Sequence, residues 1–132
     1  MRPVPVPDDT SEGFWAATAN GVLALATCRA CTSATHPPTP VCPHCGTTEP
    51  AWSFVPVEPS GVVRSWTVLR QAFLPGFAEE LPIVLVDVAL DGHDDLRLIG
   101  RLLDGPGAPL RLGEAVVVDF EPGGIPAFRR SP

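Results

Sequence analysis

The sequence predicts a mainly β protein in which a short N-terminal helix precedes a zinc ribbon and a small five-stranded barrel. Two observations predict this fold class. The four cysteines of the 132-residue chain form two C-x-x-C pairs that are separated by ten residues. After position 60, short β-branched segments alternate with turn residues, and no helical periodicity competes with this pattern.

The N-terminal region is expected to be an extended arm followed by a short helix. Residues 1–8 alternate proline with valine, which disfavours a helix. Acidic and hydroxyl side chains that suit an N-cap, followed later by an Asn-Gly stop, predict a helix over 10–19. A helix this short must pack on something. Its bulky residues, Phe14 and Trp15, are expected to contact either the rest of this chain or another subunit.

The four cysteines predict one structural zinc ion per chain. Two residues between cysteines let a tight turn aim two sulfurs at a common point, and two such turns complete a tetrahedron around Zn²⁺. The predicted ligands are Cys28, Cys31, Cys42 and Cys45. Disulfides would require an oxidising compartment, and a redox pair would leave the other pair idle, so zinc is favoured. Because all four ligands are thiolates, the metal has no open position and is expected to hold structure.

The two turns that carry the ligands, here called knuckles, differ in composition. The second has Gly46 after its last ligand, and glycine permits the positive φ that frees backbone N–H groups to point at sulfur. The first has Thr32 at the corresponding place and is predicted to be the weaker knuckle. His36 and His44 could replace a cysteine as ligands, but with four sulfurs available they are expected to be bystanders.

Strands are expected on both sides of the knuckles. Residues 22–27 lead into the first knuckle, and the alternating segment 51–55 forms the return strand. The proline-rich connector 35–40 leaves little room for a helix, which favours a ribbon over a helix-containing zinc finger. We therefore divide the chain into an arm and helix at 1–21, a rubredoxin-like zinc ribbon at 22–59 and a barrel at 60–132.

The third part is expected to be a closed barrel of the OB type. Residues 82–90 are β-branched and nearly continuous, as in a strand that is buried on both faces. Apolar and charged residues alternate over 96–102, where Gly100 is predicted to mark a bend or bulge. The five strands are expected at 61–73, 82–90, 96–102, 115–121 and 125–129. Five short strands with a long, curved first strand fit an OB-fold.

The segment between the first two barrel strands places large apolar side chains in an expected loop. Phe77 and Leu81 belong to this segment, and Phe73 lies beside it. Loops seldom expose aromatic side chains without a partner. Either Phe77 folds back over the barrel mouth, or the segment binds another subunit or a lipid-like acyl chain.

Charge and composition argue against several classes of function. The net charge is −6 and all nine basic residues are arginines, a balance of the wrong sign for a nucleic-acid partner. No apolar run is long enough to span a bilayer and no leader pattern is present, so we expect a cytoplasmic protein with reduced thiols. No activated nucleophile or phosphate-binding loop is suggested, so the chain is expected not to be an enzyme by itself.

The order of these parts resembles the acyl-CoA-associated zinc-ribbon/OB-fold family, which was long labelled only as a domain of unknown function. The motifs that carry the resemblance are Phe14-Trp15, the four cysteines, the Gly61–Val68 strand, Pro75-Gly76-Phe77 with Leu81-Pro82, Gly100-Arg101-Leu102 and Phe120-Glu121-Pro122. They span about residues 10–130. Thr32 and His36 depart from the family's pattern, at places that usually hold a glycine and an aromatic residue, and neither departure removes a ligand.

The resemblance implies a non-catalytic accessory subunit of a thiolase-superfamily enzyme that acts on acyl-CoA thioesters. Such partners are thiolases, hydroxymethylglutaryl-CoA synthase and the thiolase-like aldolases that shorten steroid side chains. We expect a heterotetramer, with one copy of this chain per catalytic subunit of a dimer. The expected partner interface consists of Phe14, Trp15, Phe73, Phe77 and Leu81.

Two other functions stay open at this point. A nucleic-acid-binding zinc-ribbon/OB module is favoured by fold analogy and opposed by the negative charge. A free-standing acyl-CoA or lipid-binding protein is opposed by the size of the barrel, because a small barrel is filled by its own side chains.

Overall fold

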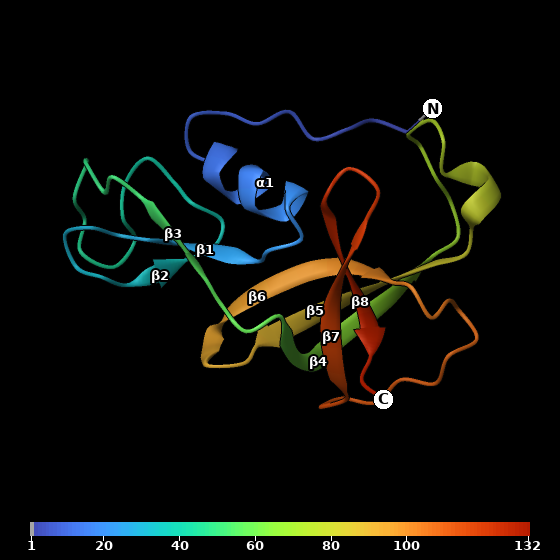
Figure 1. Ribbon diagram of the computed structural model, residues 1–132. Coiled ribbons are helices and arrows are strands. Elements are labelled where there is room, and N and C mark those ends of the chain that lie inside the picture. The colour runs from blue at the N-terminus through green and yellow to red at the C-terminus, as the bar shows by residue number, and fades with distance from the viewer. Residues whose placement is uncertain (1) are drawn as a thin grey trace.

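The chain folds as a mainly β protein with one N-terminal α-helix, a three-stranded ribbon sheet and a closed five-stranded barrel, which confirms the predicted fold class (Figure 1). The computed structural model describes residues 2–132. Its elements are α1 (Glu12–Ala19), β1 (Ala24–Thr27), β2 (Ala34–Thr35), β3 (Ser53–Pro56), β4 (Ser60–Leu69), the 3₁₀ helix η1 (Ala78–Glu80), β5 (Ile83–Leu90), β6 (His93–Leu102), β7 (Ala115–Glu121) and β8 (Ile125–Arg130). Over these residues, no helix combines the length and the apolar character that crossing a bilayer requires.

The ribbon sheet has the strand order β2-β1-β3, and both pairings are antiparallel. The central strand β1 pairs with β3 over its whole length, so that Leu25 lies opposite Val55. The pairing of β1 with β2 involves only two residues on each strand. The connector therefore contributes a strand that is too short to produce a periodic pattern, which is why sequence reasoning missed β2.

The barrel closes in the order β4-β5-β6-β8-β7, with β7 returning to β4. All pairings are antiparallel except that of β6 with β8, which is parallel. Five strands joined in this way form an OB barrel. Val86, Val88 and Leu90 of β5 are fully buried in it, as the continuous apolar run predicted.

Three details of the barrel differ from the expectation. β6 begins at His93 rather than at residue 96, so the residues expected to form a turn before it belong to the strand. β4 ends at Leu69 rather than at residue 73, because its pairing with β5 stops there. Gly100 marks no bulge, since the register of β5 with β6 is regular on both sides of it. A Cβ at Gly100 would lie 3.0 Å from the Phe128 ring, so this glycine makes room for the largest fully buried side chain of the barrel.

One hydrophobic core joins the helix, the ribbon and the barrel. Phe14 of α1 and Leu23 and Leu25 of the ribbon belong to the same buried cluster as the barrel residues. Phe14 is only 5% exposed, so this helix packs on its own chain. Trp15 is half-buried, with its ring set edge-on to the Phe14 ring at 5.1 Å between centroids.

The helix begins two residues later than expected because Asp8 organises the chain in front of it. The Oδ1 atom of Asp8 accepts hydrogen bonds from the backbone N–H groups of Thr10 and Ser11, and the Asp8 carbonyl accepts one from Glu12. The hydrogen bonds from Ser11 and then from Thr10 hold the pKa of the Asp8 carboxyl below its usual value. In front of Asp8, the arm crosses the molecule, and Arg2 at its start bonds to Glu80 of η1 (Figure 1).

Gly13 should be essential to the contact between the helix and the ribbon. A Cβ added there would overlap the ring of Phe54 on β3. We therefore expect Gly13→Ala to lower the free energy of unfolding by about 1–3 kcal/mol through overpacking, although alanine is the better helix former. Thermal and urea unfolding measure this change. The double variant Gly13→Ala/Phe54→Leu should recover part of the loss, and a stabilising Gly13→Ala substitution would show that the helix is not seated as described.

Candidate functional site

The four cysteines come together at one end of the ribbon, although the two pairs lie on different turns. Their Sγ atoms all lie within 4.8 Å of one another. The Sγ–Sγ distance is 3.9 Å for Cys28 and Cys45 and 3.7 Å for Cys31 and Cys42. A tetrahedron with Zn–S bonds of about 2.3 Å has edges of about 3.8 Å, so the cluster fits one Zn²⁺. The four thiolates complete its coordination, and the zinc is structural.

The backbone of the two knuckles follows the same plan. In the first, Thr32 N–H donates to Cys28 O at 2.8 Å; in the second, Gly46 N–H donates to Cys42 O at 2.9 Å. Thr32 has φ 63° and Gly46 has φ 77°, so both occupy the left-handed region. A β-branched residue is strained there and glycine is not. The first knuckle therefore has the geometry of the second but carries backbone strain. This strain is the physical reason to expect the first knuckle to be the weaker one.

The pKa values of two thiols in the cluster, those of Cys31 and Cys45, are shifted in opposite directions. Hydrogen bonds from Ser33 lower the pKa of Cys31 to about 6. At Cys45, the backbone N–H of Thr47 acts in the lowering direction, but desolvation and the neighbouring thiols together raise the pKa to about 11. Four negative sulfurs at this spacing repel one another, and a bound cation offsets this repulsion. The donor set therefore suits a divalent cation.

The two histidines of the ribbon stand outside the cluster. His36 packs on the ring of Phe14 at 5.2 Å between centroids, so it occupies the place of the aromatic residue that the family pattern has there. Burial lowers the pKa of His36, and its Nδ1 atom is buried without a hydrogen-bond partner among the described residues. The His44 ring contacts the carbonyl oxygen of Ala34 at 3.2 Å.

An apolar groove of about 600 Å³ lies on the outer face of the barrel, beside the loop between β4 and β5. Its floor is formed by strand residues whose side chains share one face of the sheet, namely Leu69, Ile83, Leu85 and Ile99. Its wall is formed by loop residues, namely Phe73, Leu74, Phe77 and Leu81. Phe73 is 91% exposed, and Ile99 is 65% exposed. Such a concentration of exposed apolar side chains is typical of an interaction surface.

A network of four charged residues closes one end of the groove. Arg2 pairs with Glu80 and Glu121, and Arg101 pairs with the same two carboxylates. Hydrogen bonds from Arg2 and then Arg101 lower the pKa of Glu80 to about 2. The Arg2 guanidinium also lies 5.0 Å from the centroid of the Phe77 ring. The N-terminal arm is thereby fastened to the loop.

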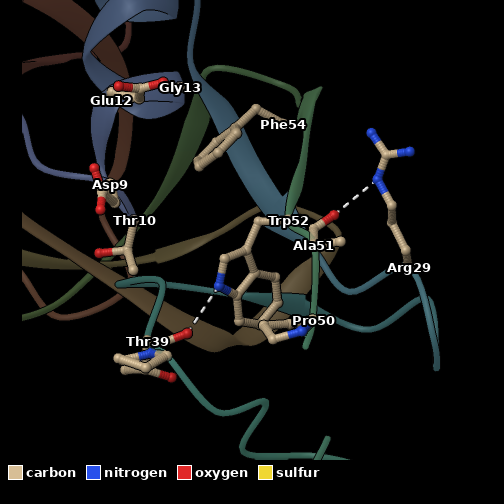
Figure 2. Close-up of a pocket in the computed structure, with 11 residues that line it drawn as sticks. Asp9, Thr10, Glu12, Gly13, Arg29, Thr39, Pro50, Ala51, Trp52 and Phe54 are labelled. Atoms are coloured by element: carbon tan, nitrogen blue, oxygen red, sulfur yellow. Dashed lines mark hydrogen bonds between the residues drawn. The ribbon is translucent and has the colours of Figure 1, made fainter. Parts of the chain in front are cut away.

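A second depression, of about 530 Å³, lies between the start of α1 and the ribbon (Figure 2). Trp52 Nε1 donates to the carbonyl of Thr39 at 2.8 Å, and Arg29 Nε donates to the carbonyl of Ala51 at 2.7 Å. These hydrogen bonds fix the ribbon loops that form its lower wall.

The five residues expected at a partner interface fall into two sets. Phe73, Phe77 and Leu81 line the groove together. Phe14 is a core residue of this chain and Trp15 packs against it, so we do not carry these two into the proposed interface. Sequence reasoning missed the ion-pair network, because its members are up to 119 positions apart and no local pattern links them.

A zinc ribbon joined to an OB barrel, with four thiolates that complete a structural metal site, defines a class of zinc-ribbon/OB-fold proteins. Residues 15–51 match the family model described as the ChsH2 rubredoxin-like zinc ribbon domain. Residues 54–121 match the model described as the ChsH2 C-terminal OB-fold domain. The chain therefore belongs to the ChsH2 family, which confirms the resemblance drawn from the sequence.

Two solved structures are similar to the chain. The chain is similar to a chain of the Ltp2-ChsH2(DUF35) aldolase, with 30% identity, a TM-score of 0.80 and coverage of 96% of this chain and 98% of that one. A DUF35 protein of unknown function from Sulfolobus solfataricus shares the fold, with 12% identity, a TM-score of 0.63 and coverage of 93% and 86%.

The curated relative is a probable enoyl-CoA hydratase alpha subunit from Thermomonospora curvata. It is 31% identical over 120 residues, which are 91% of this chain. The chain spans only about a third (36%) of the length of that relative.

Removing the strain of the first knuckle should tighten zinc binding. A threonine in the left-handed region costs roughly 1–2 kcal/mol, and Thr32→Gly removes this cost. Part of the gain in stability is lost because glycine has greater freedom in the unfolded chain. We expect a gain of about 1 kcal/mol, or about fivefold in resistance to a chelator. Chelator competition measures it. The matched variant Gly46→Thr introduces the same strain at a site with open space around the glycine and should weaken binding; equal affinities for both variants would contradict this account.

Burial of His36 should make the stability depend on pH. Burial holds the pKa of His36 in the folded chain below its ordinary value of 6.5, so the unfolded chain takes up the proton more readily. The free energy of unfolding should therefore be highest above pH 6.5 and fall as the pH decreases below it. His36→Phe should flatten this dependence between pH 7.5 and 5.5. Denaturant titrations across this range check the difference, and identical slopes for wild type and His36→Phe would contradict it.

Proposed function

We propose that this chain is a non-catalytic accessory subunit of a thiolase-like enzyme that acts on acyl-CoA thioesters. The observation that carries the proposal is the likeness to a chain of the Ltp2-ChsH2(DUF35) aldolase over 96% of this chain, at 30% identity. The name of that structure describes an assembly of Ltp2 with ChsH2, and this chain carries both ChsH2 domains. From the family resemblance we further propose that the acyl group of the CoA thioester is derived from a steroid side chain.

The chemistry of the described residues supports an accessory role. All four cysteines of the chain stand in the metal cluster, where their sulfurs are committed as ligands. The carboxylate of Glu80 is held ionised by Arg2 and Arg101, two arginines that line the groove. A carboxyl group with a pKa of about 2 is poorly matched to general acid–base catalysis near neutral pH.

The groove supplies a surface for the catalytic subunit. Burying one large apolar side chain contributes roughly 1.5–3 kcal/mol, and Phe73, Leu74 and Ile99 are each more than half exposed. Phe77 and Leu81 extend the same apolar surface. We propose that these side chains anchor the chain to its partner in a heterotetramer, with the fully exposed Phe73 as the main anchor.

A second candidate partner follows from the curated relative. The probable enoyl-CoA hydratase alpha subunit shares 31% identity with this chain, so a hydratase-type catalytic subunit is the alternative to a thiolase-like one. Both candidates predict an accessory role toward a CoA thioester enzyme. They differ in which catalytic subunit forms a stable complex with the chain.

Co-expression tests the proposal and distinguishes the partners. The chain is co-produced with each catalytic candidate from its own genome, a thiolase-like subunit and a hydratase-type subunit, and complexes are isolated through a tag on the chain. We expect a 2:2 complex with the thiolase-like subunit, detected by native mass spectrometry. Recovery of only the hydratase-type subunit would transfer the proposal to that enzyme, and recovery of neither would overturn it.

Phe73→Asp should reduce this co-purification at least about tenfold, because it places a charge in an apolar contact. Zinc content and melting temperature should not change, since the side chain is 91% exposed in the free chain. Leu112→Asp is the matched control, because Leu112 is 71% exposed and is not among the groove residues. Equal loss in both variants, or no loss in Phe73→Asp, would contradict the assignment of the groove.

A further inference from the structure

The long strand β4 is paired on both sides over only part of its length. On one side, β4 pairs with β5 from Gly61 to Leu69. On the other side, its pairing with β7 covers residues 60–62, and Val63 adds two backbone hydrogen bonds, one to the carbonyl of Glu114 and one from the N–H of Gly113. Beyond Val63, no strand or loop among residues 2–132 forms a backbone hydrogen bond with this outer edge.

A bulge marks the point where the outer pairing ends. The register of β4 with β5 shifts between Val63 and Ser65, so that Arg64 is the extra residue. Bulges bend a strand and end its pairing on one side. Hydrogen-bonding directions alternate along an antiparallel strand, and Val63 directs its groups outward. After the extra residue, the alternation turns the N–H and C=O groups of Trp66 and Val68 toward the open edge.

This edge lacks the usual protection against pairing with another chain. Natural edge strands are interrupted by proline, by lysine or by a bulge within the exposed stretch. The five residues 65–69 read Ser-Trp-Thr-Val-Leu and contain none of these. Trp66 is 41% exposed, Val68 37% and Leu69 36%, so the side chains as well as the backbone are open to a partner.

The charges at the two ends of the edge indicate which kind of strand could pair with it. Arg64 and Arg70 flank it, both are exposed, and neither forms a salt bridge within the described part of the chain. In a two-fold antiparallel pairing of two copies centred on Thr67, each Arg64 would face an Arg70. Like charges directly opposite each other are destabilising, and two chains of net charge −6 also repel. A second copy is therefore a poor occupant.

We propose that the outer edge of β4 over Ser65–Leu69 receives an extended strand of a partner protein, apolar in its middle and acidic at both ends. The strand adds to the barrel by β-augmentation, with hydrogen bonds to the backbones of Trp66 and Val68. Its acidic ends pair with Arg64 and Arg70. The edge adjoins the apolar groove through Leu69, which belongs to both surfaces. The proposal goes beyond the accessory role and does not depend on which enzyme supplies the strand.

A pair of synthetic peptides tests the proposal on the isolated, zinc-loaded chain. The first is acetyl-Glu-Val-Thr-Val-Thr-Val-Glu-amide, and the second replaces both glutamates with lysines. With the acidic peptide, the backbone amide signals of Trp66 and Val68 should shift in ¹⁵N-resolved NMR spectra and exchange more slowly with solvent. The Thr67 amide, which the alternation directs toward β5, is the internal control and should change much less.

The charge requirement is tested by reversal. The wild-type chain should bind the acidic peptide at least about fivefold more tightly than the basic one, and Arg64→Glu/Arg70→Glu should invert this preference. The proposal is overturned if no amide along β4 responds, or if both peptides act equally. It is also overturned if, without any peptide, the amides of Trp66 and Val68 are protected from solvent exchange and this protection increases with the concentration of the chain. In that case a second copy covers the edge. None of these results depends on co-purification of a catalytic subunit, so the two proposals can fail separately.

Discussion

The zinc–thiolate tetrahedron is the constraint on which the rest of the architecture depends. The ribbon sheet has strands of two to four residues, which cannot bury enough apolar surface to be stable alone. The four sulfurs hold its two knuckles together, and zinc coordination supplies the missing folding free energy. The ribbon can then present Leu23 and Leu25 to Phe14 of the helix and to the barrel in one continuous core. Zinc coordination, through the ribbon that it stabilises, thus fixes the position of the helix.

The sequence was most informative where the physical cause is local. The four ligands could be predicted because a C-x-x-C turn needs only adjacent residues, and the β5 strand because continuous burial leaves a continuous apolar run. The strained Thr32 was also visible, since the same place in the other knuckle carries a glycine. These features need no knowledge of which distant segments meet.

Features that depend on distant contacts could not be predicted. The place where β4 ends is set by its pairing with β5, and Gly100 is required by a ring that lies 28 positions further along the chain, that of Phe128. The arm is held by ion pairs between Arg2 and Glu80, which are 78 positions apart. Phe14 and Trp15 illustrate the same difficulty, because a short aromatic helix looks alike whether it packs on its own chain or on another. Only the three-dimensional structure shows that Phe14 belongs to the core.

The two exposed surfaces of the barrel suggest how the proposed accessory subunit would serve its enzyme. The groove offers side chains for hydrophobic burial, and the β4 edge offers backbone groups for directional pairing, so together they could fix both the affinity and the orientation of a partner. The most direct test is to measure acyl-CoA turnover by the chain alone, by the thiolase-like subunit alone and by the complex of the two. The account predicts no turnover by the chain alone and full activity only in the complex. Turnover by the isolated chain, or full activity of the catalytic subunit without it, would contradict the central claim.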